Sequence, residues 1–302
     1  MKKIFVIIVT YKGKQWYDRC FTSLRESTIP VQTIVVDNAS NDGSVEYIKE
    51  HYPEIILIES KENFGFGKAN NVAMRYALDH NCDYVFLLNQ DTWIKPDTLS
   101  LMLPIAELRK ECGIFSPMHV NGEEKSLYIE IEDGYTDHAN ELLSDCYFQS
   151  LKELYYFKYV NAAAWLLPRN TLEVVGGFDP LFFLYGEDDN YLHRLEYHGL
   201  KVGLIPKAVI VHDHKDGKEV KTITYKNYRF WQTRLVEYLN IQHKLSAYST
   251  ISYYLRKIIV SVLCFDRKSF KHFLSELRFF LRHKKSIENS RRVNMCRGTS
   301  WL

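Results

Sequence analysis

The first 90 residues alternate short apolar runs with amphipathic stretches, and this alternation restricts the fold more than any other feature. The runs are rich in β-branched residues and apolar on both faces, as buried strands are; they cover residues 4–9, 33–37, 55–58 and 84–88. Helical spacing marks the stretches between them, at 15–27, 44–51 and 67–80. This order predicts an α/β fold: a mostly parallel, Rossmann-like sheet with helices on both faces.

Further along, the pattern is less regular. Residues 119–157 are polar, aromatic and irregular, and we predict no element there. A strand is expected over 159–167, a helix near 171–175, a helix over 187–198, and two short strands at 202–205 and 208–212. Beyond residue 225 the pattern is helical, aromatic and basic. Ser44 is a candidate N-cap for the second helix.

Polar clusters follow the apolar runs, and in parallel sheets ligands bind where loops leave the carboxyl ends of strands. Asp37 and Asn38 enter a turn that opens a helix, where a carboxylate can accept hydrogen bonds from a base or ribose. Gly65 and Gly67 allow close approach of a ligand to the backbone, and Lys68 stands at a helix start, suited to a phosphate. Turn chemistry and loop packing explain both clusters as well.

Two acidic features and one histidine complete the set. Asp91 directly follows a buried strand, a position suited to binding Mg²⁺ or Mn²⁺ together with substrate phosphates. The run 187–189 places three acids in the first turn of a helix, where the macrodipole offsets part of their repulsion and one can act as a general base. His212 ends an apolar strand and can ligate a metal beside Asp91, although a structural imidazole fits there too.

Together and in this order, the clusters resemble glycosyltransferase family 2, specifically the bacterial rhamnosyltransferase-like group with the GT-A fold, over about residues 5–214. The resemblance implies a nucleotide site, in which Asp37 and Asn38 read the base, with these members: Thr10, Tyr11, Asp37, Asn38, Asn63, Lys68, Asn89 and Gln90. It implies a divalent cation, Mn²⁺ or Mg²⁺, at Asp91 and His212. It implies Asp188 as the catalytic base, next to Glu187, and an acceptor side that comprises Trp165, Gly177, Phe178 and Asp179.

The implied activity is transfer of a sugar, with inversion, from a nucleotide sugar (a UDP- or dTDP-sugar) to a glycan or lipid-linked acceptor in bacterial surface polysaccharide synthesis. Asn89 departs from the family's Asp-x-Asp motif, and Asn190 stands where many relatives have an acid. These departures keep open a non-catalytic relative that binds a nucleotide sugar or carbohydrate. A sugar-nucleotide pyrophosphorylase is a further alternative, but the loop after the first strand lacks the expected glycine-rich, basic sequence.

Charge divides the chain. Residues 215–302 hold 19 Lys and Arg against 6 Asp and Glu, a net charge of +13, whereas the whole chain carries +2, which leaves −11 for residues 1–214. We therefore predict a GT-A catalytic domain over 1–216, with a nucleotide-sugar half at about 1–118 and an acceptor half at about 119–216. A helical, basic, aromatic C-terminal region follows over 217–302.

The basic region predicts contact with an anionic membrane surface, and the stretch 269–280 has the amphipathic spacing for it. Packing on the body or formation of a homo-oligomer explains the same aromatic faces. Nucleic acid is disfavoured as a partner because the acidic body repels a polyanion. The six scattered cysteines indicate reduced thiols, and no apolar run is long enough to span a bilayer. We expect a cytoplasmic protein, peripheral on the inner face of the cytoplasmic membrane.

Overall fold

The computed structural model describes residues 2–128, 139–213 and 223–302. Its body is built on a central sheet with strand order β3-β2-β1-β4-β8-β6-β9-β5, and β7 pairs with β9. The strands are β1 (Ile4–Thr10), β2 (Gln32–Asp37), β3 (Ile56–Glu59), β4 (Tyr84–Leu88), β5 (Thr92–Ile94), β6 (Cys112–Asn121), β7 (Tyr155–Phe157), β8 (Ala164–Pro168) and β9 (Lys201–His212).

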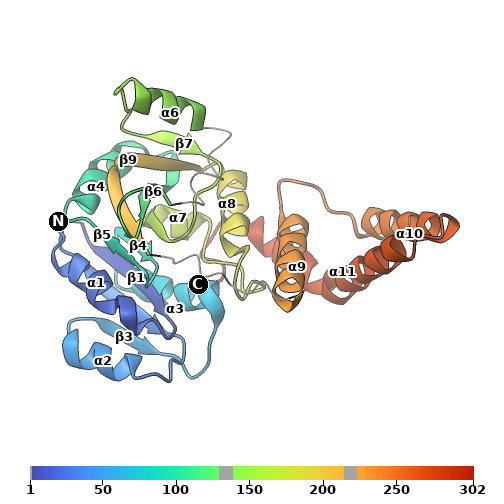
Figure 1. Ribbon diagram of the computed structural model, residues 1–302, viewed down its shortest axis with the longest axis horizontal. Helices are drawn as coiled ribbons and strands as arrows, with labels where there is room; N and C mark the ends of the chain where they lie inside the picture. The colour runs from blue at the N-terminus through green and yellow to red at the C-terminus, as the bar shows by residue number, and fades with distance from the viewer. Residues whose placement is uncertain (1, 129–138, 214–222) are drawn as a thin grey trace.

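Helices cover both faces of the sheet (Figure 1). Those of the body are α1 (Lys14–Arg25), α2 (Ser44–His51), α3 (Gly65–Asp79), α4 (Thr98–Leu108), α6 (Ala139–Tyr147), α7 (Arg169–Val174) and α8 (Glu187–Tyr197). Those of the C-terminal region are α9 (Ile223–Leu239), α10 (Ala247–Leu263) and α11 (Arg267–Asn294).

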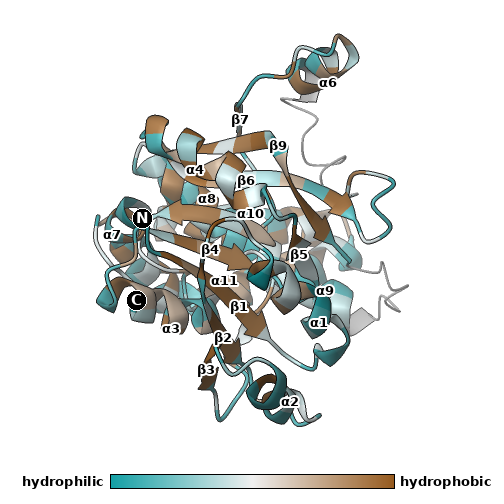
Figure 2. Ribbon diagram, turned by 90° about the vertical axis from the view of Figure 1, so that its left-hand side faces the viewer, coloured by the Kyte–Doolittle hydropathy of each residue, from teal (hydrophilic) through white to brown (hydrophobic). Residues whose placement is uncertain are grey.

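The strands have apolar residues on both faces because each face packs on its own core. Along β1, Phe5 and Ile7 belong to the core beneath α3, α7 and α8, whereas Ile4, Val6 and Ile8 belong to the core beneath α1, α2 and α4. Side chains of a strand alternate between its two faces, so one apolar run supplies both cores. The strands are accordingly hydrophobic and lie between helices whose outer sides are largely hydrophilic (Figure 2).

The direction of the strands decides where the loops meet. β1 pairs in parallel with β2 and β4, while β8 lies antiparallel to both β4 and β6. Because β9 pairs in parallel with β6, it runs in the same direction as β1. The carboxyl ends of β1, β2, β4, β6 and β9 therefore lie at one edge of the sheet. The predicted mostly parallel α/β architecture is confirmed, with β5, β7 and β8 as antiparallel members.

Several local predictions were wrong. The two strands predicted at 202–205 and 208–212 are one strand, β9, which continues past Pro206 because its register against β6 shifts between Pro117 and Met118. Such a bulge tolerates a residue that has no N–H to donate. The strand predicted over 159–167 begins only at Ala164. Gly43 occupies the N-cap of α2, and the hydroxyl of Ser44 donates to Asp42 instead.

The region without predicted elements is partly regular. It contains the end of β6, the helix α6 and the strand β7. The approximate boundary between the two predicted halves, at 118–119, falls inside β6. The predicted boundary at 216–217 and the residue His214 lie outside the described residues.

The C-terminal helices form a third core, against α8 and the loop before it, and the hairpin of α10 and α11 extends away from the sheet (Figure 1). Phe182 of the body packs there with Leu239, Phe280 and Ile287. Within the described ranges, no helix combines the length and apolar composition needed to cross a bilayer.

A buried carboxylate ties this region to the body. Asp179 is fully buried, accepts hydrogen bonds from the hydroxyl of Ser290 and from Asn294 Nδ2 (2.8 Å), and its other oxygen accepts from Leu181 N (3.0 Å). Nearby, Gly177 N donates to Ser300 O at 2.8 Å. The end of α11 and the residues after it are therefore part of the body's packing.

Replacement of Asp179 by alanine should destabilise the fold, because it leaves the donors of Ser290 and Asn294 buried and unsatisfied. We expect a loss of about 2–4 kcal/mol in the free energy of unfolding, measured by urea denaturation. The matched control is Asp79→Ala at the exposed end of α3, which should change stability by less than about 0.5 kcal/mol. Equal effects of the two variants would contradict the role of Asp179.

Candidate active site

The carboxyl edge of the sheet gathers most of the predicted nucleotide-binding residues. Asp37, at the end of β2, is buried; its Oδ1 accepts from Thr10 Oγ1 (3.1 Å) and its Oδ2 from Ser40 N (2.8 Å). Asn38 donates through Nδ2 to Gly65 O (3.0 Å) and accepts at Oδ1 from Phe64 N (3.1 Å). The two side chains thus join the ends of β1 and β2 to the start of α3.

A second set of contacts holds the loop after β1. Gln90 Oε1 accepts from Tyr11 N at 3.0 Å, and Gln90 Nε2 donates to Tyr11 O at 3.3 Å. Gly13 is needed beneath this amide, since a Cβ there would lie 2.0 Å from Gln90 Oε1. Gln90 therefore positions the loop, and the half-exposed ring of Tyr11 lies at its surface, where a base can stack.

Asn63 and Lys68 lie at the start of α3, but on different sides. Asn63 Oδ1 accepts from Gly65 N (2.8 Å) and shapes the turn into the helix, beside Asn38. Lys68 is exposed and lines a hollow on the outer side of α3 with Arg75 and Trp301. The structure thus brings Asn63 into the nucleotide edge and directs Lys68 toward the end of the chain.

Asp91 and His212 meet at the same edge. The turn 89–91 leaves β4 and enters β5, which pairs antiparallel with β9 so that Thr92 stands opposite His212. Asp91 Oδ1 lies 3.4 Å from His212 Nε2, and both side chains are largely buried. Asp213 N donates to Asp91 O at 2.9 Å, and Asp213 Oδ2 accepts from Trp16 Nε1 at 3.3 Å. Asp213 was not predicted as part of the site, although it adjoins His212 in the sequence.

The donors of Asp91 and His212 fit a divalent cation whose coordination is completed by substrate oxygens. One carboxylate and one imidazole suit Mn²⁺ or Mg²⁺, and no group of three His, Cys, Asp or Glu side chains forms a closed metal site in the described ranges. Next to the pair, Thr92 Oγ1 and His119 Nδ1 are buried without a hydrogen-bond partner among the described residues. Tyr128 packs its ring 4.4 Å from that of His212 and limits the freedom of the imidazole.

The three acids occupy the first turn of α8, after Gly186 at φ +91°. Glu187 is buried, and its Oε2 has no hydrogen-bond partner in the described part of the chain. Burial, followed by the charge of Asp188, raises the pKa of Glu187 to about 8. Burial and Asp188 likewise raise the pKa of Asp189 to about 7, against a smaller opposing effect of Arg229.

Asp188 has a different environment from its neighbours. It is half-buried, and its carboxylate accepts from Tyr159 OH (3.1 Å) and from Asp189 N (3.0 Å). Four residues after Tyr159, Ala163 O accepts from Asn89 N at 2.9 Å. The segment 159–163 therefore links the acidic turn to the turn that carries Asp91. Tyr159 escaped prediction because it counted as an apolar residue of an expected strand.

The predicted acceptor-side residues support α8 from below. Trp165, Phe178 and Tyr191 form an aromatic cluster with ring centroids 5.1–6.1 Å apart, and all three are fully buried. Gly177 O accepts from Arg194 NH1 of α8 (2.6 Å), and Asp179 binds α11 as described above. These residues lie beneath the acidic turn and are too buried to contact an acceptor. They act on the site by fixing the position of α8.

Helix α9 covers the loop that leads into the acidic turn. Tyr228 OH donates to Leu184 O (2.7 Å) and accepts from Leu184 N (3.2 Å). The guanidinium of Arg229 lies 4.2 Å from the ring centroid of Tyr185, an attractive cation–π geometry. The C-terminal region thus contributes to the surroundings of Asp188, which no pattern in the sequence indicated.

Glu187 should make stability depend on pH. Its folded pKa of about 8 lies above the unfolded value of about 4.3, so its favourable contribution is complete below about pH 4 and is lost as the pH rises through about 8. Between pH 5 and pH 9, the free energy of unfolding should therefore fall more in the wild type than in Glu187→Gln. We expect the two decreases, measured by chemical denaturation, to differ by on the order of 2–4 kcal/mol. The exposed control Glu62→Gln should follow the wild type; a Glu187→Gln curve parallel to the wild type would refute the buried, protonated carboxyl.

Comparison with known proteins agrees with this geometry. The family model for glycosyl transferase family 2 matches residues 5–161. The N-acetylglucosaminyl-diphospho-decaprenol L-rhamnosyltransferase of Mycobacterium tuberculosis is 23% identical over 239 residues, which cover 71% of this chain and 78% of that protein. Rhamnosyltransferase WbbL of Escherichia coli K12 is 26% identical over 285 residues, 88% of this chain and 98% of WbbL.

Solved structures share the fold at low identity. Staphylococcus aureus TarS 1-349 in complex with UDP-GlcNAc superposes with a TM-score of 0.60 at 13% identity, over 97% of this chain and 90% of that chain. The mannosyltransferase PcManGT from Pyrobaculum calidifontis, in complex with GDP-Man and Mn²⁺, superposes with a TM-score of 0.53 at 19% identity, over 96% of this chain and 73% of that chain. The GT-A fold is confirmed. Since the family model spans more than half of its residues, this chain belongs to glycosyl transferase family 2, as a glycosyltransferase of the rhamnosyltransferase-like group.

Proposed function

We propose that this chain is an inverting, metal-dependent glycosyltransferase of bacterial surface polysaccharide synthesis. It moves a sugar from a nucleoside diphosphate sugar to a hydroxyl of a glycan or lipid-linked acceptor, at the inner face of the cytoplasmic membrane. The observation that carries the proposal is the link between two chemical groups: Asp188 binds Tyr159, and the segment after Tyr159 binds the turn of Asp91. The proposed catalytic base and the proposed diphosphate-binding pair are thus connected through the short segment 159–163.

The donor is expected to be a dTDP- or UDP-sugar. Among the relatives, that of Shigella flexneri is a dTDP-rhamnosyl transferase, 24% identical over 72% of this chain, and TarS was solved with UDP-GlcNAc. dTDP-rhamnose therefore stands first in a donor panel. The nucleobase of the donor would lie at Asp37 and Asn38, between the half-exposed Tyr11 and the start of α3.

In the proposed reaction, Asp188 accepts the proton of the acceptor hydroxyl as its oxygen attacks the anomeric carbon. The bond to the nucleoside diphosphate breaks on the opposite side, so a single displacement inverts the configuration. A divalent cation bound by Asp91 and His212 would supply charge stabilisation for the leaving diphosphate. Tyr159 holds the carboxylate of Asp188, and the protonated Glu187 avoids a second full charge beside it.

The base assignment is tested with Asp188→Asn. Base catalysis typically contributes about 10²–10⁴-fold, so we expect kcat to fall by at least about 100-fold while the dissociation constant for the donor stays within about threefold. Asp189→Asn is the matched control, because it removes a neighbouring acid of the same turn and should lose less than about tenfold. Similar losses in both variants would remove Asp188 from this role. Donor binding without transfer by the wild type would instead favour the non-catalytic alternative motivated by Asn89 and Asn190.

The metal assignment is tested at the other end of the edge. Asp91→Asn and His212→Ala should each raise the Mn²⁺ concentration for half-maximal activity by at least about tenfold, because each removes a donor of a two-residue set. The readouts are reactivation after chelation and the Mn²⁺-induced shift in melting temperature with nucleoside diphosphate present. Asp79→Asn serves as the exposed control. Activity that survives thorough chelation would contradict the metal requirement.

A further inference from the structure

Helix α10 is apolar on two opposite sides. Its inner side, with Ile251, Tyr254 and Ile258, packs into the C-terminal core against α11. Its outer side carries apolar side chains that are about half exposed or more: Leu255 (47%), Ile259 (57%), Val260 (54%), Val262 (55%) and Leu263 (72%). Exposed apolar side chains that cluster in this way mark a site of interaction with a protein or a membrane. The described part of the chain leaves these side chains of α10 about half exposed or more.

The turn between α10 and α11 extends this apolar surface. Phe265 is 92% exposed and has a left-handed backbone conformation, φ +54°. The turn is well defined, because Asp266 caps α11 by accepting from Lys268 N and Ser269 N, both at 3.0 Å. An aromatic ring held outward on an ordered tip is unfavourable in water and suits insertion between lipids.

Positive charge surrounds this surface. Five exposed basic residues lie on or next to α10 and the turn, namely Arg256, Lys257, Arg267, Lys268 and Lys271. α10 itself contains no acidic residue, and Asp266 in the turn is engaged in capping α11. Apolar side chains bordered by Lys and Arg are the chemistry that binds an anionic lipid surface.

The predicted membrane-contact stretch 269–280 is not the exposed element. Its aromatic residues are turned inward: Phe280 is 1% exposed, and the ring of Phe279 stacks on Trp231 of α9 at 4.4 Å. The apolar side of this stretch serves instead as the scaffold that presents α10, while Lys271 stays exposed beside the turn.

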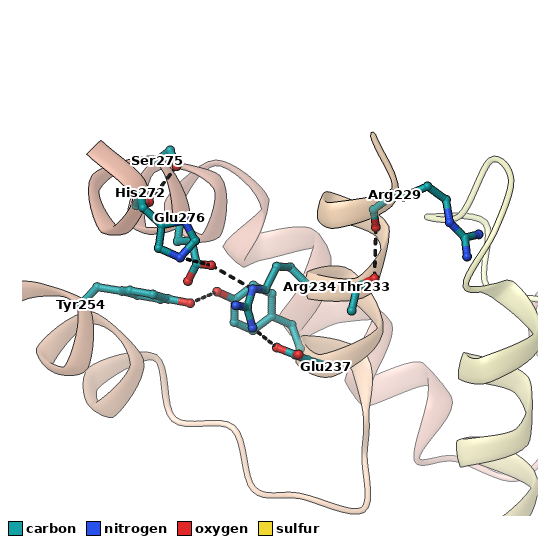
Figure 3. A network of polar contacts seen from close by, with 9 residues as sticks. Arg229, Thr233, Arg234, Glu237, Tyr254, His272, Ser275 and Glu276 are labelled. Atoms are coloured by element: carbon teal, nitrogen blue, oxygen red, sulfur yellow. Dashed lines mark hydrogen bonds and ion pairs between the residues drawn. The ribbon is translucent and has the colours of Figure 1, made fainter. Parts of the chain in front are cut away.

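The scaffold is held by a polar network that joins three helices (Figure 3). Arg234 Nε of α9 donates to the buried Glu276 of α11 at 2.9 Å, and Tyr238 OH lies 2.6 Å from Tyr254 OH of α10. These contacts fix α10 against α9 and α11, and the hairpin of α10 and α11 projects away from the sheet (Figure 1).

We propose that the outer side of α10 together with Phe265, here called the α10 surface, docks this protein on a bilayer that contains anionic lipid. The apolar side chains enter the boundary between headgroups and acyl chains, and the five basic residues bind the headgroups. A second copy of the chain is a poorer occupant, since facing α10 surfaces would bring two sets of five positive charges together. The proposal rests on the proposed function, because it would hold the enzyme at the bilayer in which lipid-linked acceptors lie.

The test uses the full chain and co-sedimentation with vesicles of phosphatidylcholine alone or with 30% phosphatidylglycerol. We expect binding to the anionic vesicles that weakens at high salt. Leu263→Ser/Phe265→Ser should lower the partition coefficient at least about tenfold, because the apolar contact is lost. Lys268→Gln/Lys271→Gln should lower it on anionic vesicles only. The matched control is Leu108→Ser, which removes an exposed leucine (77%) from α4 of the body.

Two outcomes would overturn the proposal. One is vesicle binding that neither pair of substitutions changes. The other is a wild-type dimer in sedimentation velocity that Leu263→Ser/Phe265→Ser converts to a monomer, which would make a second copy the occupant. Transfer to a water-soluble acceptor analogue should be unchanged in these variants. Loss of vesicle binding with normal transfer therefore separates the α10 surface from the proposed catalytic function.

Discussion

The antiparallel strand β8 is the element on which the site depends. It lies between β4 and β6 and runs against both, so β6 and the neighbouring β9 return to the direction of β1, β2 and β4. Without this reversal, His212 at the end of β9 would not share an edge with Asp37 and the turn after β4. Pairing of β5 with β9 then closes the distance between Asp91 Oδ1 and His212 Nε2 to 3.4 Å. The segment that leads into β8 also carries Tyr159, the partner of Asp188.

The first half of the sheet could be predicted because both of its faces are buried. Continuous β-branched runs identify such strands without tertiary information, and the helices between them follow from their spacing. β5, by contrast, has three residues and exists because β9 provides its partner, and β9 crosses Pro206 only through a register shift against β6. These features depend on pairing between segments that are far apart in the chain, which local pattern does not encode.

The residues of the site likewise fall into those that local sequence pattern could place and those that depend on contacts between distant segments. Asp37, Asn38, Asp91 and His212 stand at the ends of strands, so topology brings them together once the strands are correctly ordered. The sequence could place Gln90 at the carboxyl edge of the sheet, but it could not show that Gln90 positions the loop after β1. That contact with the backbone of Tyr11 depends on the absence of a side chain at Gly13. Tyr159 and Arg229 were missed because neither a tyrosine before a strand nor an arginine in a basic helix indicates a neighbouring acid.

The C-terminal region does more than add a basic surface to the acidic body. Its core takes in Phe182 from the loop before Glu187, while Tyr228 binds that loop through Leu184, and α11 holds Asp179 beneath α8. The burial that raises the pKa of Glu187 thus belongs to a turn that the C-terminal helices help to hold. Because α11 is a single continuous helix that ends at this contact and begins at the turn of Phe265, the α10 surface and Asp179 are attached to the same helix. Orientation of the α10 surface at a bilayer would therefore also fix the direction from which an acceptor approaches Asp188.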